Sequence, residues 1–350
     1  MSIGAWSRRS DPLALFGLSI PAQKRYPAPI VSDLLAGVLA ALISTNAPAA
    51  TSNLLRQETG LSIEIPNPND PVEKEFRNVL AQDDAAVEEV EKWADTANAA
   101  AAAGDTHAQT TLRLRVRQRL EEVKKDYQDF LQLHPDYVRA LLAYGSFLNQ
   151  SGDSDAARVQ WEKARQLAPN NPAAWDNLGT LYEEGDAKKS FEYFSKAIEL
   201  DPSQAVYYHN LAAAVYLFRQ EAADYWKISD QQVFDKSLGL YQKALKLAPA
   251  DFVLATDYAE CFYGINPPRW QDGLAAWKEC LKIARDDVER QGVYIHLARI
   301  NLLLSNFDDA RRDLDAVTNA MFFKLKSRIS RNIDDAIQNV LTNGPPQPLR

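Results

Sequence analysis

The chain has 350 residues, of which 46% are hydrophobic and 25% are charged, so it is long enough for a large core or an extended array. Its formal net charge of −8 gives no electrostatic support for a general role in binding nucleic acid, and we expect no nucleic-acid partner. Glycine is sparse while Ala, Leu, Glu, Gln and Lys are plentiful, a balance that favours helices over strands.

The first 50 residues combine a basic tail with an apolar segment. Residues 1–29 are basic, and residues 30–50 contain the apolar run Leu34–Ile43 and then Ala47-Pro48-Ala49, which resembles a signal-peptide cleavage site. The long stretch before the run is unusual for a simple signal, so three interpretations stay open: a cleaved signal that starts downstream of Met1, an uncleaved membrane anchor, or a soluble amphipathic helix. The order of basic and apolar residues favours export or anchoring, and with it membrane association through residues 30–50.

The next segment leads into a long helical hairpin. Residues 51–71 end in the turn-rich stretch "IEIPNPNDP" and are interpreted as a linker. We predict the folded body to begin just after it, with a hairpin over residues 72–137 whose helices span Asp83–Ala103 and Thr106–Leu133.

The second helix of this hairpin contains the stretch "LRLRVRQRL", with arginines at 113, 115, 117 and 119. We expect Arg117 and Arg119 to pair with Glu121 and Glu122 at helical spacing. An exposed capping helix explains these arginines better than a nucleic-acid patch does, and an anionic partner is the alternative.

Four prolines mark an internal period. Pro135, Pro169, Pro202 and Pro249 each follow an apolar helix, at intervals of 34, 33 and 47 residues, and three of the four end the phrase A-x-x-L-x-P. A fixed period of this length is the sequence signature of a repeat architecture.

One stretch carries the repeat pattern in full, "WDNLGTLYEEGDAKKSFEYFSKAIELDP". Trp175, Leu178, Gly179 and Tyr182 match the first-helix pattern W-x2-L-G-x2-Y, and Phe194, Ala197 and Pro202 match the second-helix pattern. The chain therefore resembles the tetratricopeptide repeat family over roughly Val87 to Phe323. We predict that these conspicuous residues build the hairpin and contact no ligand.

The resemblance implies an all-α fold: a right-handed superhelical solenoid of about five to six helix hairpins, with a long N-terminal hairpin cap and a C-terminal capping helix. The array is expected over residues 138–323, with about thirteen extra residues in an insertion at about 218–234 that contains Tyr225-Trp226. Residues 324–343 are interpreted as the capping helix and residues 344–350 as a disordered tail.

No catalytic motif is present, and we expect no catalytic residue, cofactor or metal. The histidines, at 107, 134, 209 and 296, are far apart, and none has another His or Cys at metal-ligand spacing. Cys261 and Cys280 belong to no CxxC pair, so we interpret them as small core residues, with a disulfide as the alternative in an oxidising compartment.

In the family, the first helix of each pair lines a concave groove that binds peptides or proteins. The residues at the corresponding positions, with Asn177 and Asn210 beside them, are the candidate binding residues: Arg139, Ser146, Asn149, Asp176, Asn177, Thr180, Glu183, His209, Asn210, Tyr216, Glu260 and Arg299. The lysines of the family's carboxylate clamp are missing, which argues against an acidic chaperone tail as ligand. We therefore expect a non-enzymatic interaction scaffold at the cell envelope of a bacterium, facing the periplasm. A cytoplasmic adaptor is the alternative, an enzyme is a distant third, and the oligomeric state stays open.

Overall fold

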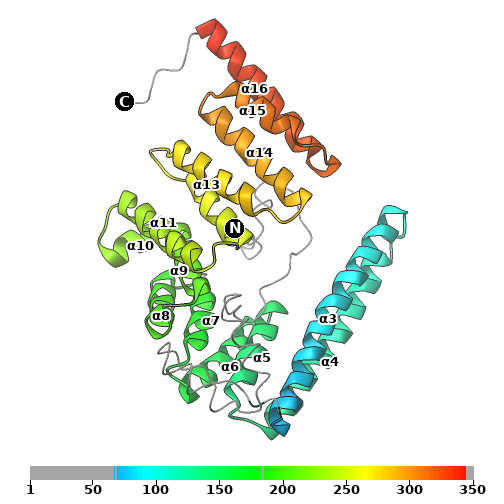
Figure 1. Ribbon diagram of the computed structural model, residues 1–350. Coiled ribbons are helices and arrows are strands. Elements are labelled where there is room, and N and C mark those ends of the chain that lie inside the picture. Colours follow the sequence, from blue (N-terminus) through cyan, green and yellow to red (C-terminus); the bar gives the residue numbers. More distant parts are fainter. Residues whose placement is uncertain (1–66, 68, 183–184, 344–350) are drawn as a thin grey trace. The chain divides into compact units, whose positions relative to one another are not determined.

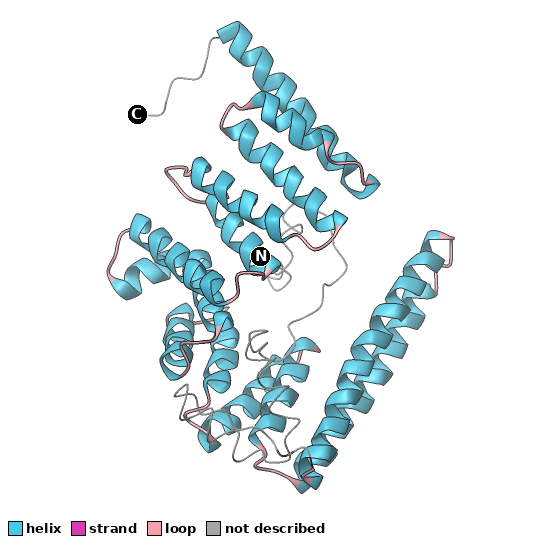
Figure 2. Cartoon of the chain, viewed as in Figure 1, coloured by secondary structure: helices cyan, strands magenta, loops and turns pink. Residues whose placement is uncertain are grey.

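The computed structural model describes residues 67, 69–182 and 185–343, and all regular secondary structure in this part of the chain is helical (Figure 2). The described helices fall into two compact units, with α3–α8 in the unit that ends at Pro202 and α9–α16 in the unit that begins at Ser203 (Figure 1). The first unit contains α3 (Pro71–Ala102), α4 (Ala108–Leu133), α5 (Val138–Gln150), α6 (Ser154–Leu167), α7 (Pro172–Tyr182) and α8 (Ala187–Leu200). The second contains α9 (Ala205–Leu217), α10 (Arg219–Trp226), α11 (Asp230–Leu247), α12 (Phe252–Glu260), α13 (Trp270–Ile283), α14 (Asp287–Leu303), α15 (Phe307–Asp315) and α16 (Phe323–Asn343), with short 3-10 helices η2 (Cys261–Tyr263) and η3 (Ala320–Phe322).

Helix α3 begins earlier than predicted. The side chain of Asp70 accepts a hydrogen bond from the Glu73 amide, and Pro71 occupies the first helical position, which is a strong start signal. Asp83, the predicted start, instead lies inside α3, where it accepts a 2.8 Å hydrogen bond from the Tyr127 hydroxyl of α4. The prediction for this helix start was wrong because the signal stood at the end of the stretch interpreted as a linker.

The next two hairpins of this unit pack in the same way, with a glycine of the first helix against an aromatic ring of the second. In the α5–α6 hairpin a Cβ at Gly145 would lie 2.2 Å from Trp161 Nε1, and in the α7–α8 hairpin a Cβ at Gly179 would lie 2.7 Å from the Phe194 ring. The first helix of each pair thus needs glycine where the aromatic ring of the second helix crosses it. Leu178, Phe194 and Ala197 are fully buried, which confirms the predicted packing role of these motif residues.

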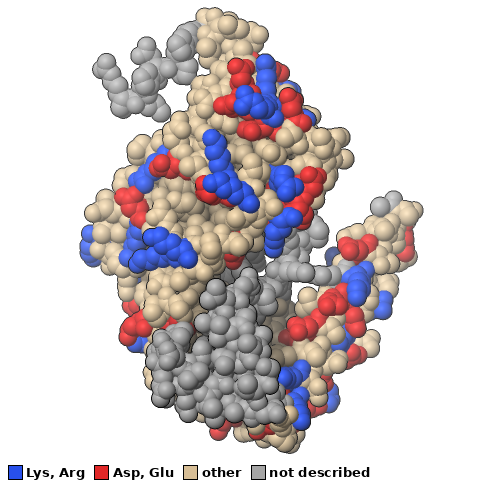
Figure 3. Space-filling model, viewed as in Figure 1, with Lys and Arg blue, Asp and Glu red and all other residues tan. Residues whose placement is uncertain are grey.

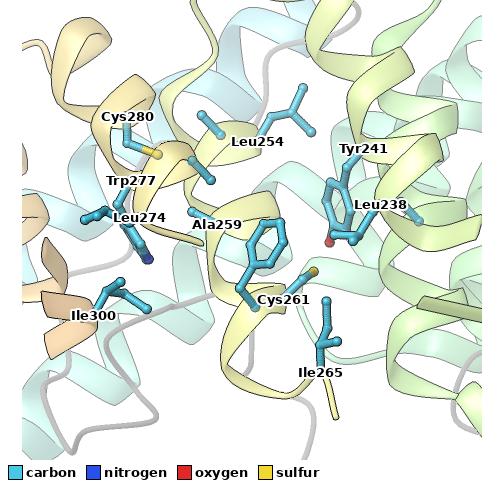
Figure 4. Packing of buried hydrophobic residues seen from close by; sticks show 14 of the residues in the cluster. Leu238, Tyr241, Leu254, Ala259, Cys261, Ile265, Leu274, Trp277, Cys280 and Ile300 are labelled. Atoms are coloured by element: carbon cyan, nitrogen blue, oxygen red, sulfur yellow. The ribbon is translucent and has the colours of Figure 1, made fainter. Parts of the chain in front are cut away.

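The second unit continues the pairing of successive helices: α9 packs against α11, α12 against α13, and α14 against α15. The largest core cluster of this unit includes Trp277, with Leu274 and Ile300 close by, and it extends to Cys261 and Tyr241 (Figure 4). Cys261 and Cys280 are both buried free thiols, as predicted for core residues.

The predicted insertion contains a helix of its own. Helix α10 lies between α9 and α11 in the chain, and its C-cap is Lys227, whose φ of 55° is left-handed. Ser229 then starts α11 with a capping box formed with Gln232. The all-α architecture of helix hairpins is confirmed in the described residues, while the number of repeats and the capping roles stay predictions.

Candidate functional site

Arg139, the first candidate binding residue, takes part in a network that joins α5 to α3. Its Nη1 lies 2.5 Å from Oε2 of Glu73, a carboxylate that is only 3% exposed. The Tyr137 hydroxyl donates to the same oxygen at 2.6 Å, and Arg77 Nε lies 2.9 Å from Oε1. Burial alone would raise the pKa of Glu73, but the hydrogen bonds from Tyr137 and Arg77 and the charge of Arg139 lower it below its ordinary value. Arg139 therefore stabilises the contact between these helices.

The next two candidates on α5 also make bonds within the chain. The Ser146 hydroxyl donates to the Leu142 carbonyl at 3.1 Å, and the Asn149 side chain accepts from Ser154 Oγ at 2.9 Å. Both side chains are half-buried, so part of each remains accessible from solvent.

The candidate binding residues on α7 differ in their exposure to solvent. Asp176 is buried, Asn177 is half-buried, and Thr180 is exposed, with its hydroxyl donating to the Asp176 carbonyl at 3.3 Å. Glu183 lies outside the described residues. Trp175, beside them, is half-buried, and its Nε1 donates to the Pro169 carbonyl at 2.8 Å.

In the second unit the candidates on α9 bond to the following hairpin. His209 Nε2 lies 2.7 Å from Oδ2 of Asp257 on α12, and the Tyr216 hydroxyl donates to the Cys261 carbonyl at 3.1 Å. Asn210, also on α9, and Glu260, the last residue of α12, are half-buried and make further interactions. The polar side chains of these first helices thus stabilise the stacking of one hairpin on the next.

The last candidate, Arg299 on α14, borders a cavity of about 180 Å³ between α14 and α16. Its guanidinium carbon lies 4.2 Å from the centroid of the Tyr263 ring. His296, one turn earlier, stacks on Trp277 with ring centroids 4.0 Å apart and lies 3.2 Å from the Tyr263 hydroxyl through its Nδ1. Burial, and then the charge of Arg299, lower the pKa of His296 to about 3, so this side chain is neutral at physiological pH.

The walls of this α14–α16 cavity combine apolar and cationic side chains. They are formed by Ile295, His296, Arg299, Leu302, Leu325, Arg328, Ile329 and Asn332. Among the described residues that line it there is no carboxylate, so the lining carries two positive charges although the chain as a whole is acidic. The cavity is therefore electrostatically suited to a group that accepts hydrogen bonds or carries negative charge.

Sequence reasoning missed most of this lining. Arg328 and Asn332 lie one turn apart on α16, which the sequence predicts only as a cap, and the spacing of the histidines gives no reason to single out His296. The spacing of Ile295 and Arg299, one turn apart on α14, was a usable signal for one wall. The second wall could not be found without knowing that α16 packs beside α14.

Among the described residues, no cluster of three or more His, Cys, Asp or Glu side chains could hold a metal ion. No helix among the described ranges combines the length and hydropathy that a membrane crossing requires, and residues 30–50 lie outside these ranges.

Two tetratricopeptide repeat models match the chain, one over residues 138–181 and one over residues 172–204. Among curated proteins, the human protein O-mannosyl-transferase TMTC3 is 30% identical over 98 residues, which are 27% of this chain and only 10% of the transferase. Among solved structures, the type IV pilus biogenesis factor PilW is similar with a TM-score of 0.46 and 16% identity, over 67% of this chain and 96% of PilW. YrrB, a repeat protein with a peptide-binding site, gives a TM-score of 0.44 and 14% identity, over 59% of this chain and 97% of YrrB.

The matched models coincide with the α5–α6 and α7–α8 hairpins, where the motif residues pack as the repeat pattern requires. Residues 138–204 of the chain therefore form tetratricopeptide repeats.

Proposed function

We propose that this chain is a non-enzymatic interaction scaffold that docks a polypeptide partner on the exposed faces of its first helices, with the α14–α16 cavity as the strongest anchoring point. Tetratricopeptide repeats in general bind proteins or peptides, which supports the class of partner. The observation that carries the anchoring point is the cavity lining, which holds two arginines and an asparagine beside apolar side chains and includes no carboxylate among the described residues.

The size of the cavity supports a polypeptide ligand over a cofactor. Pockets that enclose drug-sized ligands usually measure roughly 300–1,000 Å³, whereas this one measures about 180 Å³. A space of this size accommodates one side chain or chain end of a partner whose remaining length lies on the neighbouring surface. Leu302, Leu325 and Ile329 would contact its apolar part, while Arg299 and Arg328 would bind its oxygen atoms.

A site-specific photo-crosslinking experiment on the full chain tests this proposal in the cells from which it derives. A photoreactive amino acid at Asn332, which lines the cavity, should capture a partner. The same amino acid at Arg331, which is exposed on the same helix but does not line this cavity, should not. Arg299→Glu should reduce capture at position 332. Equal capture at both positions, or capture that ignores Arg299→Glu, would exclude the cavity as the anchoring point.

We also propose that the protein acts at the cell envelope of a bacterium, on the side of the cytoplasmic membrane away from the cytoplasm. The basic tail and the apolar run Leu34–Ile43 that follows it support this location. Fractionation of cells that express the full chain with a C-terminal tag tests it. Recovery of all the tagged chain in the cytosol would instead favour the alternative, a cytoplasmic adaptor.

A further inference from the structure

The hairpin of α3 and α4 is longer than the hairpin beside it. Helix α4 has 26 residues and α5 has 13, which correspond to about 39 Å and about 20 Å of helix at 1.5 Å per residue. A short turn joins the two helices, which pack against each other, so the N-terminal half of α4 extends past the C-terminal end of α5 (Figure 1). This half of α4 has no counterpart on α5.

The apolar stripe of α4 nevertheless continues into this overhang. Near α5, Tyr127 and Val123 are fully buried. Toward the N-terminus the stripe continues at Leu120, Val116 and Leu112, which are only half-buried and line an open cleft of about 590 Å³. Phe147, Ser151 and Asp153, at the end of α5 and the turn to α6, form the other side of this overhang cleft. The length mismatch thus leaves apolar surface on the face of α4 that would otherwise contact a helix.

Three cations run along the same cleft. Arg113 and Arg117 follow Leu112 and Val116 by one position each, and Lys124 lies farther along α4. None of the three forms an ion pair with a described residue. The predicted pair between Arg117 and Glu121 is therefore wrong, although both residues line the cleft. Acidic and basic side chains are interspersed over the visible surface of the α3–α4 hairpin (Figure 3).

The other basic residues of α4 have partners. Arg119 Nε lies 3.0 Å from Glu89 and its Nη1 lies 3.6 Å from Glu122, as predicted for that pair. The Arg115 guanidinium lies 3.8 Å from the centroid of the Trp93 ring, and Lys125 pairs with Asp129. Unpaired cations thus coincide with the half-buried apolar stripe.

We propose that the overhang cleft binds an acidic, amphipathic α-helix of a partner protein. An apolar face with residues at i, i+3, i+4 and i+7 would pack on Leu112, Val116 and Leu120, in place of the missing extension of α5. Carboxylates beside that face would pair with Arg113, Arg117 and Lys124. The cleft carries two carboxylates of its own, Glu121 and Asp153, but Asp153 already caps α6 by accepting from the Ala156 amide at 3.1 Å.

The occupant follows from this combination of surfaces. Apolar side chains form one side of the cleft, and the phosphate backbone of a nucleic acid would not pack against them. The unpaired cations disfavour a basic helix. The α14–α16 cavity shares no residue with the overhang cleft, so this proposal stands or falls apart from the proposed anchoring point.

Synthetic 16-residue peptides and the full chain test the proposal by fluorescence anisotropy at low salt. One peptide places Leu on a single helical face with Glu on both sides of it, a second replaces each Glu with Lys, and a third is a scramble of the first. The first should bind, and the other two should bind at least about tenfold more weakly. Arg117→Glu and Val116→Asp should each weaken binding of the first peptide by about tenfold or more.

Lys125→Glu serves as the matched control, because Lys125 is exposed on the same helix but does not line the cleft. It should change the affinity by no more than about twofold, and circular dichroism should show equal helix content in all variants. Equal binding of the Glu and Lys peptides, equal losses from Arg117→Glu and Lys125→Glu, or tighter binding of a single-stranded RNA than of the acidic peptide would each overturn the proposal.

Discussion

The glycine at the crossing of α7 and α8 permits a direct test of how this array packs. Gly179→Ala would place a Cβ 2.7 Å from Cδ1 and Cε1 of Phe194, about 1 Å closer than an ordinary carbon contact. Phe194 is fully buried, so its ring has little space in which to move. Overpacking of this kind costs about 1–3 kcal/mol, and the higher helix propensity of alanine returns about 1 kcal/mol. A contact this short places the cost in the upper part of that range, at about 2–3 kcal/mol, so we expect a net loss of about 1–2 kcal/mol.

The same substitution elsewhere should have the opposite sign. Gly239 lies inside α11, and a Cβ there would meet no atom within 4 Å. Gly239→Ala should therefore increase stability by up to about 1 kcal/mol through helix propensity alone. Phe194→Leu, which shortens the opposing side chain, should make Gly179→Ala less costly than it is in the parent chain.

Urea denaturation followed by far-UV circular dichroism measures these differences, and hydrogen exchange of the α7 and α8 amides locates them. The reasoning fails if Gly179→Ala is as stable as the parent chain, or if Gly179→Ala and Gly239→Ala shift stability in the same direction. It also fails if Phe194→Leu and Gly179→Ala are additive, because residues in contact should couple.

Buried ionisable groups give the remaining predictions. Folding lowers the pKa of Glu73, so its carboxylate stabilises the α3–α5 contact above the ordinary pKa of 4.5, and this stabilisation is lost as the pH falls through the folded value. Glu73→Gln should therefore make the free energy of unfolding decline less steeply at low pH, and an unchanged slope would contradict the network. The pKa of His296 is about 3 in the folded chain against an ordinary 6.5, so between these values only the unfolded chain binds the proton. Lowering the pH from 7.5 to 5 should therefore reduce the free energy of unfolding by about 2 kcal/mol. His296→Phe should remove this loss in urea titrations at both pH values. Burial raises the pKa of Cys280 to about 12 and that of Cys261 well above its ordinary value, so mass spectrometry should detect no iodoacetamide adduct at pH 8 until urea unfolds the chain; rapid labelling of the native chain would refute this.

The sequence was sufficient for the repeats because each motif residue acts within its own hairpin. The spacing of Gly179 and Phe194 follows from the crossing of two adjacent helices, so it recurs with the period of the chain. Polar contacts between distant residues were not predictable in this way. Arg139 pairs with Glu73, a residue 66 positions earlier, and no local pattern connects the two. Helical spacing alone was also insufficient, since it predicted the pair of Arg119 with Glu122 correctly and the pair of Arg117 with Glu121 wrongly.

The placement of the candidate residues follows from the logic of stacked hairpins. An interior first helix has a neighbour on each side, and its polar side chains can bond to those neighbours, as His209 does with Asp257 and Tyr216 with the Cys261 carbonyl. Such side chains must break internal bonds before they bind a ligand, which costs free energy. A helix whose neighbour is shorter has side chains that contact no neighbouring helix, so they can bind a ligand without first breaking bonds within the chain. We therefore expect recognition to concentrate where helices of unequal length meet, at the α4 overhang and at the junction of α14 with α16.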